Sequence, residues 1–323
     1  MSLPTSLRAK PRFRVIDLHV DLPWQLHFKG RDLSLSSGHL TRRALESGPI
    51  EGLVLPLYVP DDVRATGPTL ADHDAMIGTL DQLFSQHPTL LSAPLSKPSA
   101  NQVRTWFSFE GIGAMAVDPS QMAAWVKRGV KLVGLAHMHD NALASSSTGK
   151  HKAAGLSTTG KQVAKNALDA GALLDVSHLS DASFDDVAKL SKEAGRPIVA
   201  SHSNARAVCA HPRNLTDDQL RVIAETKGIV GLNLHGQYVS SHAEPTLSDV
   251  MDQLDHLIQI AGEDHVAIGS DFDGGIHPPA QLADANQFST LASAMMQRGY
   301  SDEQIAKVFS GNALRVLNAA RTP

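Results

Sequence analysis

The sequence predicts an α/β protein, a (β/α)8 barrel formed by residues 1–323 as one domain with extended loops. Eight short apolar runs alternate along the chain with helical patterns, which is typical of a parallel sheet built from right-handed crossovers. The runs are rich in Val, Leu, Ile and Ala, as expected for strands that are buried on both faces. The length of 323 residues suits one such domain, which typically needs ~250.

Six of the eight runs end in a side chain that can bind a metal or move a proton. In chain order the runs are residues 14–19, 52–59, 106–110, 131–137, 172–178, 196–202, 228–234 and 265–271. Runs 52–59 and 228–234 have no such residue at their ends, and we interpret these two as purely structural. The regular placement of the others predicts a common site.

Apolar residues at helical spacing, together with capping residues, predict the helices between the strands. The expected ranges are 41–46, 69–86, 119–128, 157–170, 180–194, 216–226 and 246–261. Thr216 and Gln219 have the spacing of a capping box, and Ser301 and Gln304 repeat it near the C-terminus. We interpret residues 144–149 (ASSSTG) as a mobile loop at the barrel mouth.

Composition and charge exclude several classes of protein. A net charge of −4 with interspersed signs provides no basic stripe for a nucleic acid. The single cysteine, Cys209, excludes an internal disulfide framework, and no run approaches the ~18 apolar residues of a membrane span. Residues 1–14 are basic and polar without the apolar stretch of a secretory signal, so we expect a cytoplasmic protein.

The C-terminal ends of the strands of a (β/α)8 barrel converge on the active-site face. His19 and Asp21, at positions i and i+2 of a strand, would point to the same side and bind one ion. Glu110, His178 and His202 come from three other strands and could complete a site for two ions, with Glu110 bridging them. Imidazoles and carboxylates suit two zinc ions, although manganese, cobalt or iron would also fit. A hydroxide held between two such ions would perform hydrolysis.

Six motifs in chain order carry these residues: VIDLHVDLPWQL, FEG, LAHMHDNALASSS, DVSHLS, SHSNARAVCAHPRNLTDDQL and IGSDFDG. From Val15 to beyond Asp273 they resemble the membrane dipeptidase (renal dipeptidase) family, peptidase family M19 of the amidohydrolase superfamily. The resemblance implies one zinc ion held by His19, Asp21 and Glu110. It implies a second zinc ion held by Glu110, His178 and His202.

The resemblance also implies roles for residues around the ions. His137 would contact the tetrahedral intermediate and the bound peptide, and Arg213 would receive the C-terminal carboxylate of the substrate. Asp271 would take a proton from the bridging water and pass it to the leaving amine, and Tyr238 would lie in the substrate pocket.

The residues alone leave rivals for three of these assignments. His139 is an alternative to His137, and Asp273 is an alternative to Asp271. Arg213 could instead be a surface cation near the helix that opens at Thr216.

The resemblance predicts a hydrolase of dipeptides, including those with a C-terminal D-residue, and a homodimer is the family's tendency. Animal members carry a signal peptide, a lipid anchor and disulfides, so this chain is similar to bacterial cytosolic members. Loops 60–68 and 235–245 match nothing recognisable and are expected to set specificity. A related amidohydrolase acting on N-acyl amino acids or lactams is one alternative. A non-catalytic metal-binding homologue is another, and the full ligand set together with Asp271 argues against it.

Other conspicuous residues are expected to have no chemical role. Cys209 is interpreted as a packing residue, and Trp24 would either line the pocket or plug the barrel mouth. Eight further histidines are expected to be solvated in loops or on helix faces: His39, His73, His87, His151, His211, His242, His256 and His277.

Overall fold

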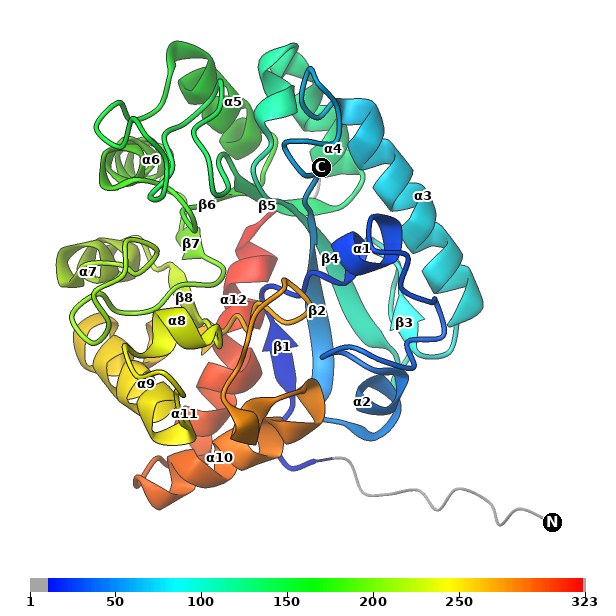
Figure 1. Ribbon diagram of the computed structural model, residues 1–323, viewed down its shortest axis with the longest axis vertical. Coiled ribbons are helices and arrows are strands. Elements are labelled where there is room, and N and C mark those ends of the chain that lie inside the picture. The colour runs from blue at the N-terminus through cyan, green and yellow to red at the C-terminus, as the bar shows by residue number, and fades with distance from the viewer. Residues whose placement is uncertain (1–10, 322–323) are drawn as a thin grey trace.

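The computed structural model describes residues 11–321 and shows a closed ring of parallel strands surrounded by helices (Figure 1). β1 (Val15–Asp17) pairs with both β2 (Ile50–Leu57) and β9 (Val266–Ile268), and this double pairing closes the ring. The strands between them follow in chain order: β4 (Val103–Phe109), β5 (Val130–Gly134), β6 (Leu173–Asp175), β7 (Ile198–Ala200) and β8 (Ile229–Leu232). The predicted (β/α)8 barrel is confirmed.

The strands are shorter than the apolar runs that predicted them, and the polar residue at the end of a run lies in the loop just beyond its strand. β6, for example, ends at Asp175, three residues before His178. One strand was not predicted: β3 (Leu91–Ser92) has only two residues and pairs with the start of β4. Most of the basic N-terminal segment that carries no apparent secretory signal lies outside the described residues.

Helices fill the connections, and all seven expected ranges contain one. The helices are α1 (Leu22–His27), α2 (Arg42–Ser47), α3 (Leu70–Gln86), α4 (Met122–Lys127), α5 (Thr158–Asp169), α6 (Asp181–Glu193), α7 (Asp217–Glu225), α8 (Gly236–Val239), α9 (Leu247–Ala261), α10 (Phe288–Gln297), α11 (Asp302–Ala306) and α12 (Asn312–Ala319). The capping boxes at Thr216 and Ser301 are both formed. None of the helices within residues 11–321 has the length and apolar character needed to traverse a bilayer.

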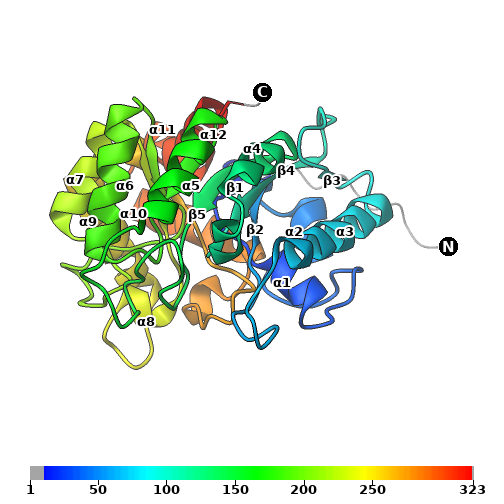
Figure 2. The ribbon, with the colours of Figure 1, turned by 90° about the horizontal axis from the view of Figure 1, so that it is seen from above.

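α12 closes the barrel from below. The interior of the barrel is filled by one inward-facing apolar side chain from most strands, and Ala313, Val316 and Leu317 of α12 belong to the same buried cluster. In Figure 1 this helix lies behind the ring of strands, and Figure 2 shows it on the opposite face from α8 and the long loops. α12 therefore covers the N-terminal end of the barrel, and α8 and the long loops lie at the other end (Figure 2).

The serine-rich segment 144–149 is packed, contrary to the mobile loop expected. Ser145, Ser146 and Ser147 are all buried. Ser146 Oγ donates a hydrogen bond to the carbonyl of His137 over 2.5 Å, and the N–H of Ser147 donates to the carbonyl of His178 over 2.8 Å. The segment thus braces the two loops that carry His137 and His178.

Candidate active site

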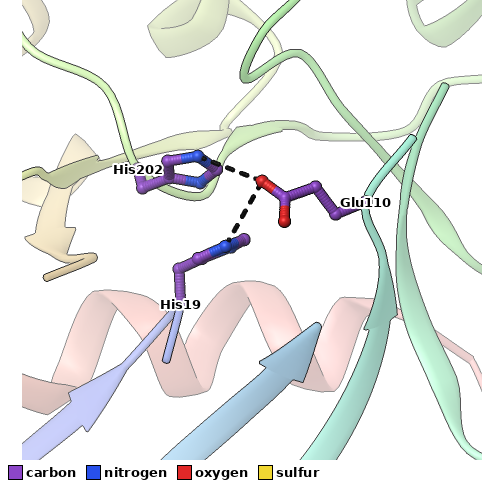
Figure 3. Close-up of side chains that lie close together, drawn as sticks. All are labelled: His19, Glu110 and His202. Atoms are coloured by element: carbon purple, nitrogen blue, oxygen red, sulfur yellow. Dashed lines mark ion pairs between the residues drawn. The ribbon is translucent and has the colours of Figure 1, made fainter. Parts of the chain in front are cut away.

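Five side chains from separate parts of the chain meet at the C-terminal end of the barrel. Oε1 of Glu110 lies 2.9 Å from Nε2 of His178, 3.4 Å from Nε2 of His19 and 3.5 Å from Nε2 of His202. Oδ2 of Asp21 lies 3.5 Å from the same nitrogen of His19. Figure 3 shows how His19, Glu110 and His202 reach one space from different elements. All five residues proposed as ligands are buried, with at most 6% of their surface exposed.

The donor atoms fit a divalent metal. Nε2 of His178 and Nε2 of His202 face each other over 2.9 Å, and Nε2 of His19 has no hydrogen-bond partner among the described residues although it is fully enclosed. Buried nitrogen and oxygen atoms normally have hydrogen-bond partners. A cation bound among these imidazole nitrogens and carboxylate oxygens would provide the partner that the protein does not. Imidazole nitrogen together with carboxylate oxygen is the donor set expected for zinc and related ions.

Three groups of donors are compact enough to hold an ion, and each has its atoms within 4.8 Å of one another. They are His19 with Glu110 and His202, Glu110 with His137 and His178, and His19 with Asp21 and Asp271. Glu110 and His19 each belong to two groups, so adjacent ions would share ligands. These groups do not reproduce the two ligand sets that the resemblance implies, since they place His137 within ligand distance as well.

The electrostatics of the cluster favour neutral imidazoles at His178 and His202, and the opposite at His19. Burial, followed by the nearby positive charge of Arg213, holds the pKa of His178 well below its usual value, and burial does the same for the pKa of His202. Burial acts to raise the pKa of Glu110, but neighbouring His19 and His137 hold it well below the usual value. Burial lowers the pKa of His19, yet Glu110 and Asp21 together raise it well above the usual value. The carboxylates of Glu110 and Asp21 thus favour a positive charge at this point of the site.

Asp271 lies beside the cluster, in a strained turn after β9. Its φ of 66° and the φ of 70° at His178 lie in the left-handed region, and such strain in non-glycine residues costs about 1–3 kcal/mol each and concentrates at functional sites. Burial, followed by the charges of Asp21 and Glu110, raises the pKa of Asp271 to about 8. A carboxyl that titrates near neutrality is suited to accept and return a proton.

Asp273, the alternative to Asp271, has a structural role, because its carboxylate is hydrogen-bonded within the fold. Its carboxylate receives hydrogen bonds from Nη1 of Arg31 over 2.6 Å and from the N–H of His39 over 2.8 Å. Only 3% of its surface is exposed. These bonds tie the loop after α1 to the turn that carries Asp271.

His137 faces the cluster and its rival His139 does not. The ring of His137 lies 4.4 Å from the ring of His178 and 4.3 Å from that of Tyr58, measured between centroids. His139 is exposed and contacts Asp61 over 3.0 Å. Burial lowers the pKa of His137, so its imidazole is neutral near pH 7 and can donate from one nitrogen.

Arg213 is buried, which contradicts its interpretation as a surface cation. Only 3% of its surface is exposed, and no carboxylate lies within ion-pair distance of it among the residues described. Nη2 donates to the carbonyl of His202 over 3.3 Å, and the guanidinium carbon lies 5.5 Å from the centre of the Tyr238 ring. A buried guanidinium without an anionic partner is costly unless a ligand supplies the negative charge.

A cavity of about 260 Å³ is lined by three of the five proposed ligands, Asp21, Glu110 and His178, whereas Arg213 is not among its lining residues. Its lining residues are Asp21, Trp24, Tyr58, Glu110, His137, Met138, His178, His235, Tyr238, Asp271, Gly274 and Ile276. Trp24, for which the sequence left two positions open, and Tyr238 both line this cavity. Loop 235–245 contributes His235 and Tyr238, whereas none of the lining residues comes from loop 60–68.

Both apolar runs interpreted as purely structural contribute to the site, so that interpretation was wrong. Run 52–59 carries Tyr58, which lines the cavity and stacks near His137. Run 228–234 carries Asn233, whose Nδ2 donates to Oδ2 of Asp271 over 3.0 Å. Tyr58 and Asn233 were missed because the sequence was inspected for metal ligands and proton carriers only. Their position at the ends of strands could have identified them.

The expectation of solvated histidines was wrong for at least two of the eight. His73 and His87 are buried, and their ring nitrogens contact the carbonyls of Thr69 over 2.9 Å and Leu33 over 2.7 Å. Both lie away from the cavity and have a structural role. Cys209 is buried and free, consistent with a packing residue.

Comparisons with known proteins agree with the geometry. A dipeptidase of Schizosaccharomyces pombe is 28% identical over 94% of this chain and 80% of its own length. A metallopeptidase from Rhodobacter sphaeroides, solved with a phosphinate mimic of L-Ala-D-Ala, is 27% identical, with a TM-score of 0.84 over 96% of this chain and 99% of its own. The M19 metallopeptidase called dipeptidase AC is 28% identical, with a TM-score of 0.85 over 97% of this chain and all of its own.

A family model covers almost the whole chain. The model that describes the membrane dipeptidases, peptidase family M19, matches residues 7–322. This range contains every strand of the barrel and every residue of the buried cluster. The chain therefore belongs to the membrane dipeptidase family of metallopeptidases, peptidase family M19.

Proposed function

We propose that this protein hydrolyses dipeptides with two zinc ions held by His19, Asp21, Glu110, His178 and His202. The observation that carries the proposal is the buried meeting of these donors, with the oxygen of Glu110 within 3.5 Å of three imidazole nitrogens. Bound divalent ions supply the Lewis acidity that activates water and polarises the peptide carbonyl.

The residues around the cluster perform the remaining steps. Asp271 accepts a proton from the attacking water and delivers it to the leaving amine, a transfer suited to its raised pKa. His137, which lines the same cavity, donates a hydrogen bond to the oxygen of the carbonyl under attack. Arg213 binds the C-terminal carboxylate of the substrate, and the ring of Tyr238 packs beside the guanidinium.

The size of the cavity supports a small substrate. Its volume of about 260 Å³ lies near the lower end of ligand pockets, which are typically ~300–1,000 Å³. Because α12 closes the far end of the barrel, a longer peptide cannot thread through it. We propose that dipeptides with a C-terminal D-residue are among the substrates, since the Rhodobacter relative was solved with a mimic of L-Ala-D-Ala.

A hydrolase of N-acyl amino acids or lactams is the second candidate. Such substrates also present a carbonyl near a carboxylate, so Arg213 would bind them equally well. The dipeptide mimic bound by the Rhodobacter relative favours a dipeptide instead. We also propose a homodimer, which sedimentation of the purified protein would test.

Hydrolysis of a substrate panel tests the proposal. The panel contains L,L- and L,D-dipeptides, N-acyl amino acids and β-lactams, each offered to zinc-loaded protein and to a chelated control. We expect zinc-dependent cleavage of the dipeptides. Cleavage of acyl amino acids alone would replace the dipeptidase with the second candidate, and no turnover by zinc-bound protein would support the non-catalytic homologue.

A further inference from the structure

Two buried carboxylates lie directly beneath the proposed metal centre and have no part in the chemistry described above. Asp17 is the last residue of β1 and is completely buried, and Asp175 is the last residue of β6 with 4% of its surface exposed. Neither belongs to the compact groups of possible metal donors found among the described residues. Neither has an arginine or lysine within ion-pair distance in that part of the chain.

Asp17 joins the ends of β1 and β9. Its Oδ1 accepts the backbone N–H of His19, two residues further along its own strand, over 3.2 Å. The same oxygen accepts the N–H of Ser270 over 2.9 Å, and Oδ2 accepts the hydroxyl of Ser270 over 2.6 Å. In the sheet Asp17 pairs with Ile268, so Ser270 lies two residues beyond its partner.

Asp175 joins the ends of β6 and β7 in the same way. Its Oδ1 accepts the N–H of Ser177, again two residues further along its own strand, over 3.0 Å. The same oxygen accepts the N–H of Ser201 over 3.0 Å. Because Asp175 pairs with Val199 in the sheet, Ser201 is also two residues beyond that partner. The two carboxylates therefore occupy equivalent positions at different points of the ring.

Each carboxylate accepts hydrogen bonds from backbone N–H groups that lie just beyond the last hydrogen bonds of the sheet. Beyond its last paired residue a strand turns away, which leaves buried N–H groups that need an acceptor. A single carboxylate oxygen that accepts a hydrogen bond from each of two neighbouring strand ends fixes the distance between the two segments that leave the sheet. Those segments carry the site residues: His19 itself donates its backbone N–H to the carboxylate, and Asp271, His178 and His202 each directly follow a serine whose N–H is bound.

The Asp175 junction also orients the imidazole of His202. Ser201 Oγ lies 2.8 Å from Nδ1 of His202 and 3.3 Å from Nδ1 of His19. Ser177 Oγ accepts the N–H of His202 over 3.1 Å and contacts Ser201 Oγ over 3.3 Å. A partner on Nδ1 leaves Nε2 free to face the metal site, so the tautomer of both rings depends on this serine pair.

We propose that Asp17 and Asp175 are positioning residues that set the metal affinity of the site, Asp17 through His19 and Asp271 and Asp175 through His178 and His202. The inference rests on the proposed function only in requiring that the cluster binds divalent ions. Neither carboxylate touches an ion or the substrate, and both act by holding the backbone that carries the ligands.

Zinc affinity of four variants tests the proposal, measured by competition with a chromophoric chelator. Asp175→Ala and Asp17→Ala each remove the shared acceptor, and we expect zinc affinity to fall about 10- to 100-fold, as for other groups that orient metal ligands. Asp175→Asn keeps an oxygen for both N–H groups, so its affinity should stay within a few-fold of wild type. Asp17→Asn should be intermediate, because Ser270 loses the acceptor of its hydroxyl proton.

Asp255→Ala provides the matched control. Asp255 is a partly buried carboxylate on α9 that accepts a hydrogen bond from the hydroxyl of Tyr300 over 2.6 Å, away from the cavity lining. Its loss should lower the thermal unfolding midpoint and leave zinc affinity unchanged. If Asp175→Ala does not fold, Asp175→Ser replaces it, since a short hydroxyl can satisfy only one of the two N–H groups and should still weaken zinc binding.

Folded alanine variants with wild-type zinc affinity would overturn the proposal, as would asparagine variants that lose as much affinity as the alanine ones. These results leave the dipeptidase activity of the wild type untouched. Wild-type protein that binds zinc but cleaves no dipeptide would reject the proposed function, while the difference between the alanine and asparagine variants would still support the positioning role. Wild-type protein that binds no zinc would reject both.

Discussion

Replacing Arg213 with methionine removes the guanidinium and keeps an unbranched apolar side chain of similar length. In the structure this group is buried, donates one hydrogen bond of 3.3 Å to the carbonyl of His202, and has no carboxylate within ion-pair distance among residues 11–321. Its Nε is buried and has no hydrogen-bond partner among the described residues. The variant therefore tests whether the free carboxylate of the substrate is the missing partner.

The expected magnitude follows from the kind of bond that is lost. A hydrogen bond to a charged group contributes about 1.5–3 kcal/mol, and each 1.4 kcal/mol is a factor of ten. We expect kcat/KM for a dipeptide with a free carboxylate to fall about 10- to 150-fold. Because the carboxylate is bound in both the ground state and the transition state, most of the loss should appear as a higher KM.

The assay compares one dipeptide with its C-terminal amide on the same enzymes. The amide lacks the negative charge, so Arg213→Met should change its kcat/KM little. Arg213→Lys should recover part of the activity on the acid, since an ammonium supplies the charge without the planar fork. Arg221→Met is the matched control, because Arg221 is exposed on α7 and pairs with Asp218 over 2.7 Å. Equal losses on the acid and the amide would refute the reasoning.

Three further predictions concern the carboxylates of the site. Asp271→Asn should retain zinc, measured as metal content, and lose about 10²- to 10⁴-fold in kcat, as expected when a general acid–base is removed; loss of the metal as well would contradict the proposed role. Gly274→Ala should weaken zinc binding in chelator competition, because its Cβ would lie 2.6 Å from Oδ2 of Asp21 and 2.8 Å from Oδ1 of Asp271. Gly78→Ala in α3, where nothing lies within 4 Å, should instead stabilise the fold by about 0.5–1 kcal/mol. Metal-free protein should lose stability in urea unfolding as pH rises from about 4 to about 8 and level off above that, because Asp271 releases its proton near pH 8 in the folded state but near 3.8 in the unfolded state. Asp271→Asn should make this slope shallower, and an unchanged slope would assign it to other groups.

The sequence predicted the barrel and the meeting of its polar strand ends because both follow from local pattern. An apolar run followed by His19 or Glu110 is visible in one dimension, and the architecture brings such ends together. The roles of Tyr58 and Asn233 depend on which side chains approach from neighbouring loops. The spacing of apolar residues along the chain carries no information about such contacts between loops.

The carboxylates at Asp17 and Asp175 were missed for a related reason. Each lies inside an apolar run, where an isolated aspartate gives no hint of the strand that will lie beside it. Their bonds to Ser270 and Ser201 depend on sheet register, which is fixed only when the ring closes. The burial of Arg213 likewise depends on how its turn packs against His202 and Tyr238. Partners distant in sequence decide each of these cases.

The position of α12 has a consequence for how the protein is made. β1 completes the ring by pairing with β9, and α12, which follows β9 in the chain, fills the lower end of the same ring. During synthesis β1 therefore emerges long before its second neighbour exists, and its unpaired edge is open to wrong associations that a nascent chain must avoid. His19 leaves the ribosome early but gains its neighbour Asp271, whose N–H donates to the carbonyl of His19 over 3.1 Å, only after β9 has been translated.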